Sequence, residues 1–357
     1  MCILLTHARA QVQDFTQAEL SLFLEACADK NALLLTGDTC QTIARGVGFR
    51  FEELTTMFYN MKVAQARQLE ARGVRLADVP KEQLCQVPEI SKLSVNYRTH
   101  NGILGAASEI VSLLLTLFPS SVDQLQKDVG HFDGPKPVLL TDTSKDDLSI
   151  LLCGSDPQHS QIEFGAHQVV LVRNQAAKAR LPIELQTALV LTIFESKGLE
   201  FDEVFIFDFF NDSPADEKTW RVLTGCIANE AASRGAPRQG SGGGGAPPAG
   251  TGKEDARADP AASLPIPMPR PVEFNKAIHS LLNEELKMLY TAITRARVKV
   301  VMYDQHKEKR APLFHYLLSR RPPLAQIFDS KEVKSGLAKS STPEEWRAQA
   351  RSRTLPV

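Results

Sequence analysis

Four short segments of the chain place one charged or amide side chain among small residues, next to an apolar run. They are GDTCQ (37–41), NYRTH (96–100), SKGLEF (196–201) and LYTAITRAR (289–297). The guanidinium groups of Arg98 and Arg295 suit phosphate oxygens, because their fork geometry matches those oxygens and they never deprotonate. Glycine also allows the backbone to approach a ligand closely. These residue types are typical of a site for a phosphate-bearing ligand.

Each segment alone also has a purely structural interpretation. Gly-Asp is common in turns, and NYRTH could be a buried tyrosine beside a helix-capping Thr99. KGLEF could be a loop between two strands, and 289–297 could be an amphipathic helix whose basic end favours the helix dipole. The order of the four segments along the chain favours the functional interpretation.

In that order the segments resemble the C-terminal motor motifs of UvrD-like superfamily 1 helicases. TIFESKGLEF (192–201) carries the resemblance most specifically, since the family version reads T-x-H-x-x-KGLEF. The chain departs from it at Phe194, where the family usually has histidine. The likeness covers roughly Val12 to Tyr303. It implies two RecA-like lobes that bind ATP between them and step along a single strand of nucleic acid.

The resemblance assigns three residues to the terminal phosphate of ATP, and these are the predicted catalytic residues. Gln41 would sense the γ-phosphate, and Arg98 and Arg295 would be arginine fingers that reach it. Basic side chains of this kind stabilise the charge of a transferring phosphoryl group.

Further contacts with ATP are implied by the same motifs. Tyr97 would stack on the adenine, and Glu200 would bind the ribose hydroxyls. Gly198 would let the backbone approach a phosphate, and Asp38 would anchor the turn or a water near the metal. Thr192, Phe194 and Lys197 would lie toward single-stranded DNA or RNA, where an aromatic side chain at 194 could stack on a base.

Two parts of such a motor are missing from the 357 residues. No G-x-x-x-x-G-K-[ST] loop grips the phosphates. The family's DEVQD motif aligns with Ala10–Asp14, so that Ala10-Gln11 stands where a metal-binding carboxylate and a water-activating glutamate belong. We therefore assign no metal ligand, and expect ATP and Mg²⁺ in the intact parent motor rather than in this chain alone. Because the likeness ends abruptly, a truncated product or gene model is favoured over a gradually decayed enzyme.

Strands that alternate with helices predict an α/β protein. The expected architecture is a RecA-like parallel sheet flanked by helices, with a complete second lobe and the end of the first. The predicted strands are 32–36, 137–140, 168–172, 188–193, 203–209 and 299–303. The predicted helices are one after a capping box at 16–19, and 51–59, 103–115 and 275–297.

Four regions follow from this pattern. Residues 1–60 are the remnant of the first lobe, 61–92 a helical linker, 93–304 the second lobe, and 305–357 a tail. Residues 231–271, rich in Gly, Ala, Pro and Ser, form a predicted disordered insertion. A helix start at Thr342, followed by Trp346, predicts the beginning of a helical repeat region. The insertion and the tail are candidate contacts for protein partners.

Composition narrows the class of protein. The hydrophobic fraction of 43% and charged fraction of 23% are ordinary for a globular protein, and the net charge of -1 gives no support to nucleic-acid binding. A basic stretch from Arg295 to Arg321 could be either a solvated surface or a phosphate-binding face. Scattered cysteines and the lack of an apolar span favour the cytoplasm or nucleus, without membrane insertion.

Two other functions remain open beside the motor. The chain could be a catalytically dead, helicase-derived interaction scaffold in which the insertion acts as a flexible tether. It could also bind nucleic acid without catalysis, with an affinity that falls as salt rises.

Overall fold

A six-stranded sheet forms the centre of the protein. The computed structural model describes residues 8–44, 47–124, 126–141, 168–182, 185, 188–235 and 267–329. The strand order is β10–β5–β9–β8–β6–β7, and all neighbours run parallel. The strands are β5 (Val138–Leu140), β6 (Gln168–Val172), β7 (Val190–Thr192), β8 (Phe201–Phe207), β9 (Ala296–Tyr303) and β10 (Gln326–Phe328). The predicted α/β class, with a parallel sheet flanked by helices, is confirmed.

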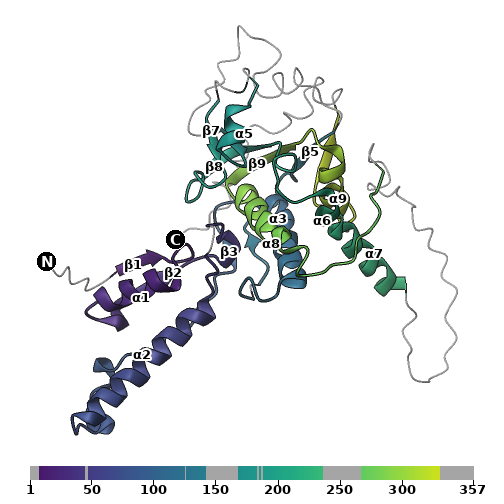
Figure 1. The fold of residues 1–357 in the computed structure, drawn as a ribbon. Helices are drawn as coiled ribbons and strands as arrows, with labels where there is room; N and C mark the ends of the chain where they lie inside the picture. The colour runs from purple at the N-terminus through teal and green to yellow at the C-terminus, as the bar shows by residue number, and fades with distance from the viewer. Residues whose placement is uncertain are drawn as a thin grey trace, which may run out of the picture.

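Both faces of this sheet are covered by apolar side chains. Successive residues of a strand point to opposite faces, so Val169 and Leu171 join one core while Val170 and Val172 join another. The first core is covered by α3 (Asn101–Leu117), α6 (Glu217–Trp220), α7 (Val222–Gly235), α8 (Ser280–Ile293) and α9 (Lys307–Leu318). The short helix α5 (Gln175–Ala179) lies against the second (Figure 1). Parallel sheets require this two-sided burial.

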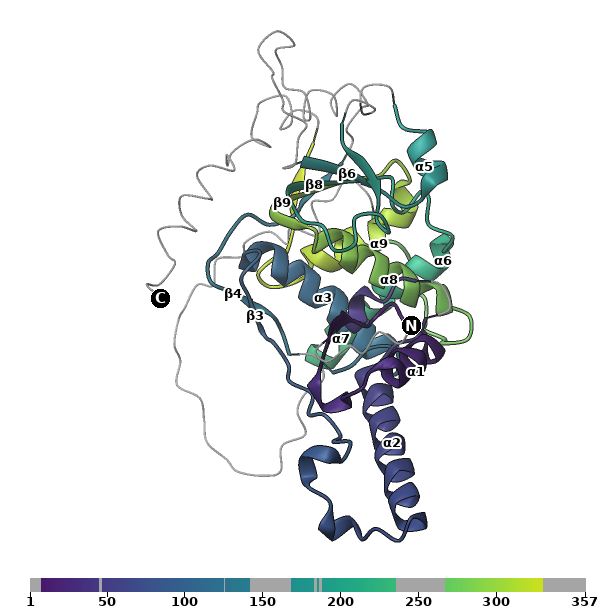
Figure 2. The same ribbon diagram turned by 90° about the vertical axis from the view of Figure 1, so that its left-hand side faces the viewer.

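A smaller unit precedes the large one. Its strands β1 (Ala8–Gln11) and β2 (Leu33–Thr36) pair in parallel, and α1 (Gln17–Ala26) lies between them in the chain. The predicted capping box is present, because the Thr16 N–H donates to Glu19 Oε2 at 2.8 Å and the Glu19 N–H to Thr16 Oγ1 at 3.3 Å. A separate apolar core holds this unit together, with Val12, Leu20, Leu24, Phe49, Leu54 and Phe58. The long helix α2 (Phe51–Ala71) projects away from the sheet (Figures 1 and 2).

A single turn of 3₁₀ helix, Thr39–Gln41, joins the small unit to the large one. Cys40 in this turn is fully buried, and its side chain belongs to the apolar core of the large unit. A second short parallel pair, β3 (Val95–Asn96) and β4 (Val129–Gly130), leads into α3. These two connections place residues 37–41 and 96–100 beside α8.

Several predicted boundaries are wrong. Helix α2 continues to Ala71, so the predicted border at 60 falls inside one helix, and 3₁₀ turns at 76–78 and 81–83 follow it. Helix α8 covers only Ser280–Ile293, and β9 begins at Ala296. The Arg295 carbonyl already accepts a hydrogen bond from the Phe201 N–H of β8, so the chain has left the helix by this residue. Strand β8 likewise begins at Phe201 rather than at 203.

The large unit also extends past the predicted border at 304. Strand β10 pairs with β5 and completes the edge of the sheet. A three-residue strand is too short to show a period, which is why the sequence did not indicate it. Helix α7 reaches Gly235, so residues 231–235 of the predicted insertion are helical. Residues 236–266 and 330–357, with most of that insertion and the predicted helix at Thr342, lie outside the described residues. Within the described ranges, no helix is long and apolar enough to cross a membrane.

Candidate functional site

Asp38 fixes the turn that carries Gln41. One oxygen of its carboxylate accepts a hydrogen bond from the Cys40 N–H at 2.9 Å. The other accepts from the Gln41 Nε2 amide at 2.7 Å and from the Tyr290 hydroxyl at 3.2 Å. Asp38 therefore anchors the turn, which is the first of the two roles that the sequence predicted for it. Burial and the negative charge of Asp38 also raise the pKa of Tyr290 well above its ordinary value.

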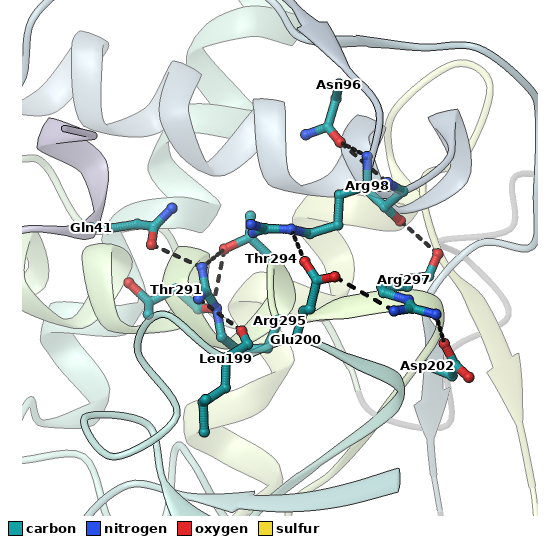
Figure 3. A network of polar contacts seen from close by, with 11 residues as sticks. Gln41, Asn96, Arg98, Leu199, Glu200, Asp202, Thr291, Thr294, Arg295 and Arg297 are labelled. Carbon is teal, nitrogen blue, oxygen red and sulfur yellow. Dashed lines mark hydrogen bonds and ion pairs between the residues drawn. The ribbon is translucent and has the colours of Figure 1, made fainter. Parts of the chain in front are cut away.

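Arg295 lies directly after α8 and is almost completely buried, at 1% exposure. Its Nε donates to the Thr291 carbonyl at 3.0 Å and its Nη1 to the Leu199 carbonyl at 3.1 Å. Its Nη2 donates to Gln41 Oε1 at 2.8 Å and to the Thr294 hydroxyl at 3.3 Å (Figure 3). Burial, and the charge of Arg98 nearby, lower the pKa of Arg295 to about 10. The guanidinium therefore stays charged at neutral pH.

Arg98 begins a row of alternating charges at the amino-terminal ends of β8 and β9. Its Nε lies 2.5 Å from Glu200 Oε2, and Glu200 Oε1 lies 3.5 Å from Arg297 Nη1. Arg297 Nη2 continues the row to Asp202 at 2.8 Å (Figure 3). The Asn96 side chain accepts from the Arg98 N–H at 2.9 Å and so holds the backbone that presents it. The side chains of Arg98 and Glu200 are 42% and 41% exposed, so both can be reached from solvent.

Tyr97 presents its ring to solvent. Its exposure is 82%, and its ring centroid lies 4.5 Å from that of His131 at a tilt of 45°. The pairing of β3 with β4 sets Asn96 opposite Gly130, which brings the next residues of the two segments together. His131 was not predicted, because only this strand pairing connects it with Tyr97.

The segment between β7 and β8 has both a buried and an exposed part. The Thr192 hydroxyl accepts from the Glu195 N–H at 3.1 Å, and the Thr192 N–H donates to the Glu195 carboxylate at 2.8 Å. Thr192 is buried, whereas Phe194 is 58% exposed. Gly198 has a φ of +81°, a conformation that side chains other than glycine rarely adopt. The glycine is therefore required by the turn itself.

Lys197 points into the protein. Its Nζ donates to the Gln41 carbonyl at 2.6 Å and forms an ion pair with Asp14, and the side chain is only 12% exposed. The structure thus places Lys197 between the two units rather than on an open surface that could receive nucleic acid. Asp14 was not assigned a role from the sequence, because nothing near it in the chain indicates a partner 183 residues away.

Two arginines of the basic stretch are turned into the protein instead of facing solvent. Arg310 is buried and its Nη1 donates to the Leu140 carbonyl at 3.0 Å. Arg320 lies over the Tyr316 ring, with its Cζ 3.8 Å from the centroid, and pairs with Glu230 at 2.5 Å. These side chains instead connect secondary-structure elements.

A pocket of about 140 Å³ opens beside the same residues. Asp38, Gln41, Arg98 and Tyr290 line its polar end, and α3 forms its apolar wall. Asp38, Gln41 and Arg295 are thus joined by hydrogen bonds and Arg98 is paired with Glu200, and Asp38, Gln41 and Arg98 line one pocket. The part of the chain that the structure describes contains no cluster of three or more His, Cys, Asp or Glu side chains arranged for a metal ion.

Comparison with known proteins shows what the chain is similar to. The model of the UvrD-like helicase C-terminal domain matches residues 168–306. The chain is 42% identical over 349 residues to TPR and ankyrin repeat-containing protein 1 of Homo sapiens, covering 95% of this chain and 11% of that protein. It thus spans about a ninth of that relative's length.

A solved structure, the C-terminal domain of a possible DNA helicase from Lactobacillus plantarum WCFS1, is also similar. It is 15% identical, with a TM-score of 0.28, and the match covers 65% of this chain and 98% of that one. The family resemblance seen in the sequence is confirmed by the match of the family model. Residues 168–306 of this chain are thus similar to the UvrD-like helicase C-terminal domain.

Proposed function

We propose that this chain is the C-terminal portion of a UvrD-like, ATP-dependent motor that binds ATP between two RecA-like lobes. The observation that carries the proposal is the contact of Gln41 with Arg295, close to the pair formed by Arg98 and Glu200. These residues come from four distant segments and from two units with separate apolar cores. If each segment had only a local structural role, these side chains would not need to lie close together.

The residues fit a nucleotide in part. Tyr97 has an exposed face for a purine, and the half-exposed Arg98 and Glu200 can turn toward a phosphate and a ribose. Arg295 would become available only after giving up the acceptor on Gln41. ATP, when bound, would supply the phosphoryl bond whose cleavage drives the motor. The chain's own residues would bind and orient it.

The residues do not fit a magnesium ion. At the end of β1, Ala10 has no side-chain oxygen and Gln11 has a neutral amide, whereas magnesium favours carboxylates and phosphate oxygens. The 357 residues also contain no glycine-rich phosphate loop. We therefore propose that the chain alone neither hydrolyses ATP appreciably nor separates a duplex.

An ATPase assay on the purified chain, with and without single-stranded DNA or RNA, tests this proposal. Binding of a fluorescent ATP analogue that weakens in the Arg98→Ala variant, without turnover, is the expected result. Robust turnover that Arg295→Ala abolishes would show that the chain is a complete enzyme. If the analogue does not bind at millimolar concentration, the proposal that this chain binds a nucleotide is wrong.

One observation favours a second candidate, an interaction scaffold derived from a helicase. The buried guanidinium of Arg295 makes four hydrogen bonds within the protein, so each of its nitrogens has a protein partner. A protein partner recovered by a chain that binds neither nucleotide nor oligonucleotide would support the scaffold. The name of the human relative mentions TPR and ankyrin repeats, and protein contacts through such repeats would agree with a scaffold. We place such a protein in the cytoplasm or nucleus.

A further inference from the structure

Lys197 occupies an unusual position for a residue of an otherwise exposed loop. It lies between Phe194, which is 58% exposed, and Leu199, which is 47% exposed, yet its own side chain is 12% exposed. The ammonium group is directed at two oxygens of the small unit, the Asp14 carboxylate and the Gln41 carbonyl. A lysine would gain solvation by turning outward, so its inward position depends on these partners.

The partners belong to two different elements of the small unit. Asp14 follows β1, and Gln41 ends the 3₁₀ turn that follows β2. One ammonium group therefore connects both strand ends of the small unit to the loop between β7 and β8. In the described residues, the small unit has its own core. Cys40 of its 3₁₀ turn is buried in the core of the large unit, and Ile43 packs against that core.

Gln41 is held by the loop on one side and, on the other, by Arg295, which also binds that loop. Lys197 binds its backbone carbonyl, while Arg295 binds its side chain with Nη2 and the Leu199 carbonyl with Nη1. Gly198, with its positive φ, forms the bend between Lys197 and Leu199. A shift of Gln41 must therefore be accompanied by a shift of this loop, or by loss of these contacts.

We propose that Lys197 is a positioning residue that ties the Gln41 turn of the small unit to the Phe194–Glu200 loop of the large unit. In this role it touches neither nucleic acid nor nucleotide. It makes the position of Gln41 depend on that of the loop that presents Phe194. In a motor, a ligand that moves Gln41 would therefore also move Phe194. This consequence rests on the function proposed above.

Cys40 provides a reporter for this tie that requires no ligand. Its thiol is fully buried beside Gln41, and it reacts with a maleimide only when the turn opens. Cys27 and Cys85, buried in the small unit, report wider unfolding in the same sample. Brief labelling of the native protein with N-ethylmaleimide, followed by peptide mass analysis, measures each thiol separately.

We expect Lys197→Met and Asp14→Asn to label Cys40 roughly threefold to thirtyfold faster than the unaltered chain, the range typical of contacting pairs. The double variant should label Cys40 little faster than the faster single variant, since both changes remove the same contact between Lys197 and Asp14. Cys27 and Cys85 should keep their rates. Lys178→Met is the matched control, because Lys178 pairs with Glu195 at 3.4 Å within the large unit.

Unchanged labelling of Cys40 in Lys197→Met would overturn the proposal, and so would an equal acceleration of all three cysteines. A second measurement tests the alternative role directly. If the slope of log Kd against log salt for oligo(dT) or oligo(U) falls by about one in Lys197→Met, Lys197 contacts a phosphate and the proposal is wrong. If the unaltered chain binds neither oligonucleotide, the nucleic-acid part of the proposed function fails. The labelling rate of Cys40 then still tests whether Lys197 ties the Gln41 turn to the loop.

Discussion

Gln41 and Arg295 are 254 residues apart in the chain, and a hydrogen bond of 2.8 Å joins Gln41 Oε1 to Arg295 Nη2. The two side chains that the motifs assign to one γ-phosphate thus satisfy each other when no ligand is bound. The Arg295 guanidinium is buried and charged. A ligand that displaces Gln41 must therefore supply another hydrogen-bond acceptor for it. The bond also joins the small unit to the large one.

Loss of this bond should destabilise the protein. Gln41→Ala leaves a buried N–H of Arg295 without its acceptor, so we expect the free energy of unfolding to fall by about 1–3 kcal/mol. Arg295→Met should cost about as much or more, because three further contacts are lost with it. Urea unfolding of the two single variants and the double variant measures the coupling.

The sum of the two single effects should exceed the effect of the double variant. Arg75→Met is a suitable control, since this arginine is 82% exposed and its pair with Asp78 lies on the surface. Additive effects would show that the bond contributes nothing to stability.

A buried ion pair between β6 and α8 gives a second prediction. Arg173 Nε donates to Glu285 Oε2 at 3.0 Å, a second contact joins Nη2 to the other oxygen, and the Glu285 side chain is 1% exposed. Arg173→Met alone leaves a buried carboxylate without its partner and should lower the free energy of unfolding by about 3–5 kcal/mol. Thermal unfolding is the measurement.

The double variant Arg173→Met with Glu285→Leu should recover most of this loss, because no unpaired charge remains. If the double variant is no more stable than Arg173→Met alone, desolvation of the carboxylate is not the cause.

Alkaline pH should destabilise the protein through Cys40 and Tyr290. Burial raises the pKa of the Cys40 thiol and that of the Tyr290 phenol, so both stay protonated in the folded state. The unfolded chain loses these protons above about pH 8.5 and about pH 10 respectively. The folded state then binds more protons, and its stability falls as pH rises, by up to about 1.4 kcal/mol per pH unit for each group.

Urea unfolding between about pH 7 and about pH 10 tests this, with Cys40→Ala as the variant, because it removes the thiol whose unfolded-state ionisation begins first. The fall above about pH 8.5 should become shallower in Cys40→Ala, even though its stability at neutral pH is lower. Lys287 acts in the opposite direction, because burial lowers its pKa in the folded state and its contribution grows as pH rises. The same slope in both proteins would contradict a buried, neutral Cys40.

The exposed Tyr97 gives a prediction about binding rather than stability. Tyr97→Ala should leave thermal unfolding nearly unchanged, because the ring is 82% exposed. It should weaken binding of a fluorescent ATP analogue about fivefold or more, since stacking of a base on an aromatic ring contributes about 1–3 kcal/mol. Tyr97→Phe keeps the ring and should bind as the unaltered chain does. Equal loss in both variants would point to the hydroxyl instead of stacking.

Much of the fold could be predicted because its signals are local. The capping box at Thr16, the apolar runs of β6 and β8 and the amphipathic α3 each depend on a few neighbouring residues. Strand β10 could not be predicted, because three residues carry no period and its place is set by pairing with β5. The length of α2 was underestimated, since most of its second half is solvent-exposed and lacks an apolar stripe.

The amino-acid sequence by itself determined which side chains could bind a phosphate and in which order they occur, because motif chemistry depends on residue type and spacing. It also determined that Ala10-Gln11 offers no carboxylate to a metal. Only the tertiary structure decided that Lys197 points to Asp14, that Arg295 is occupied by Gln41 and that His131 lies against Tyr97. The partners in these contacts are between 34 and 254 residues apart, and only the packing of the two units and the pairing of β3 with β4 bring them together.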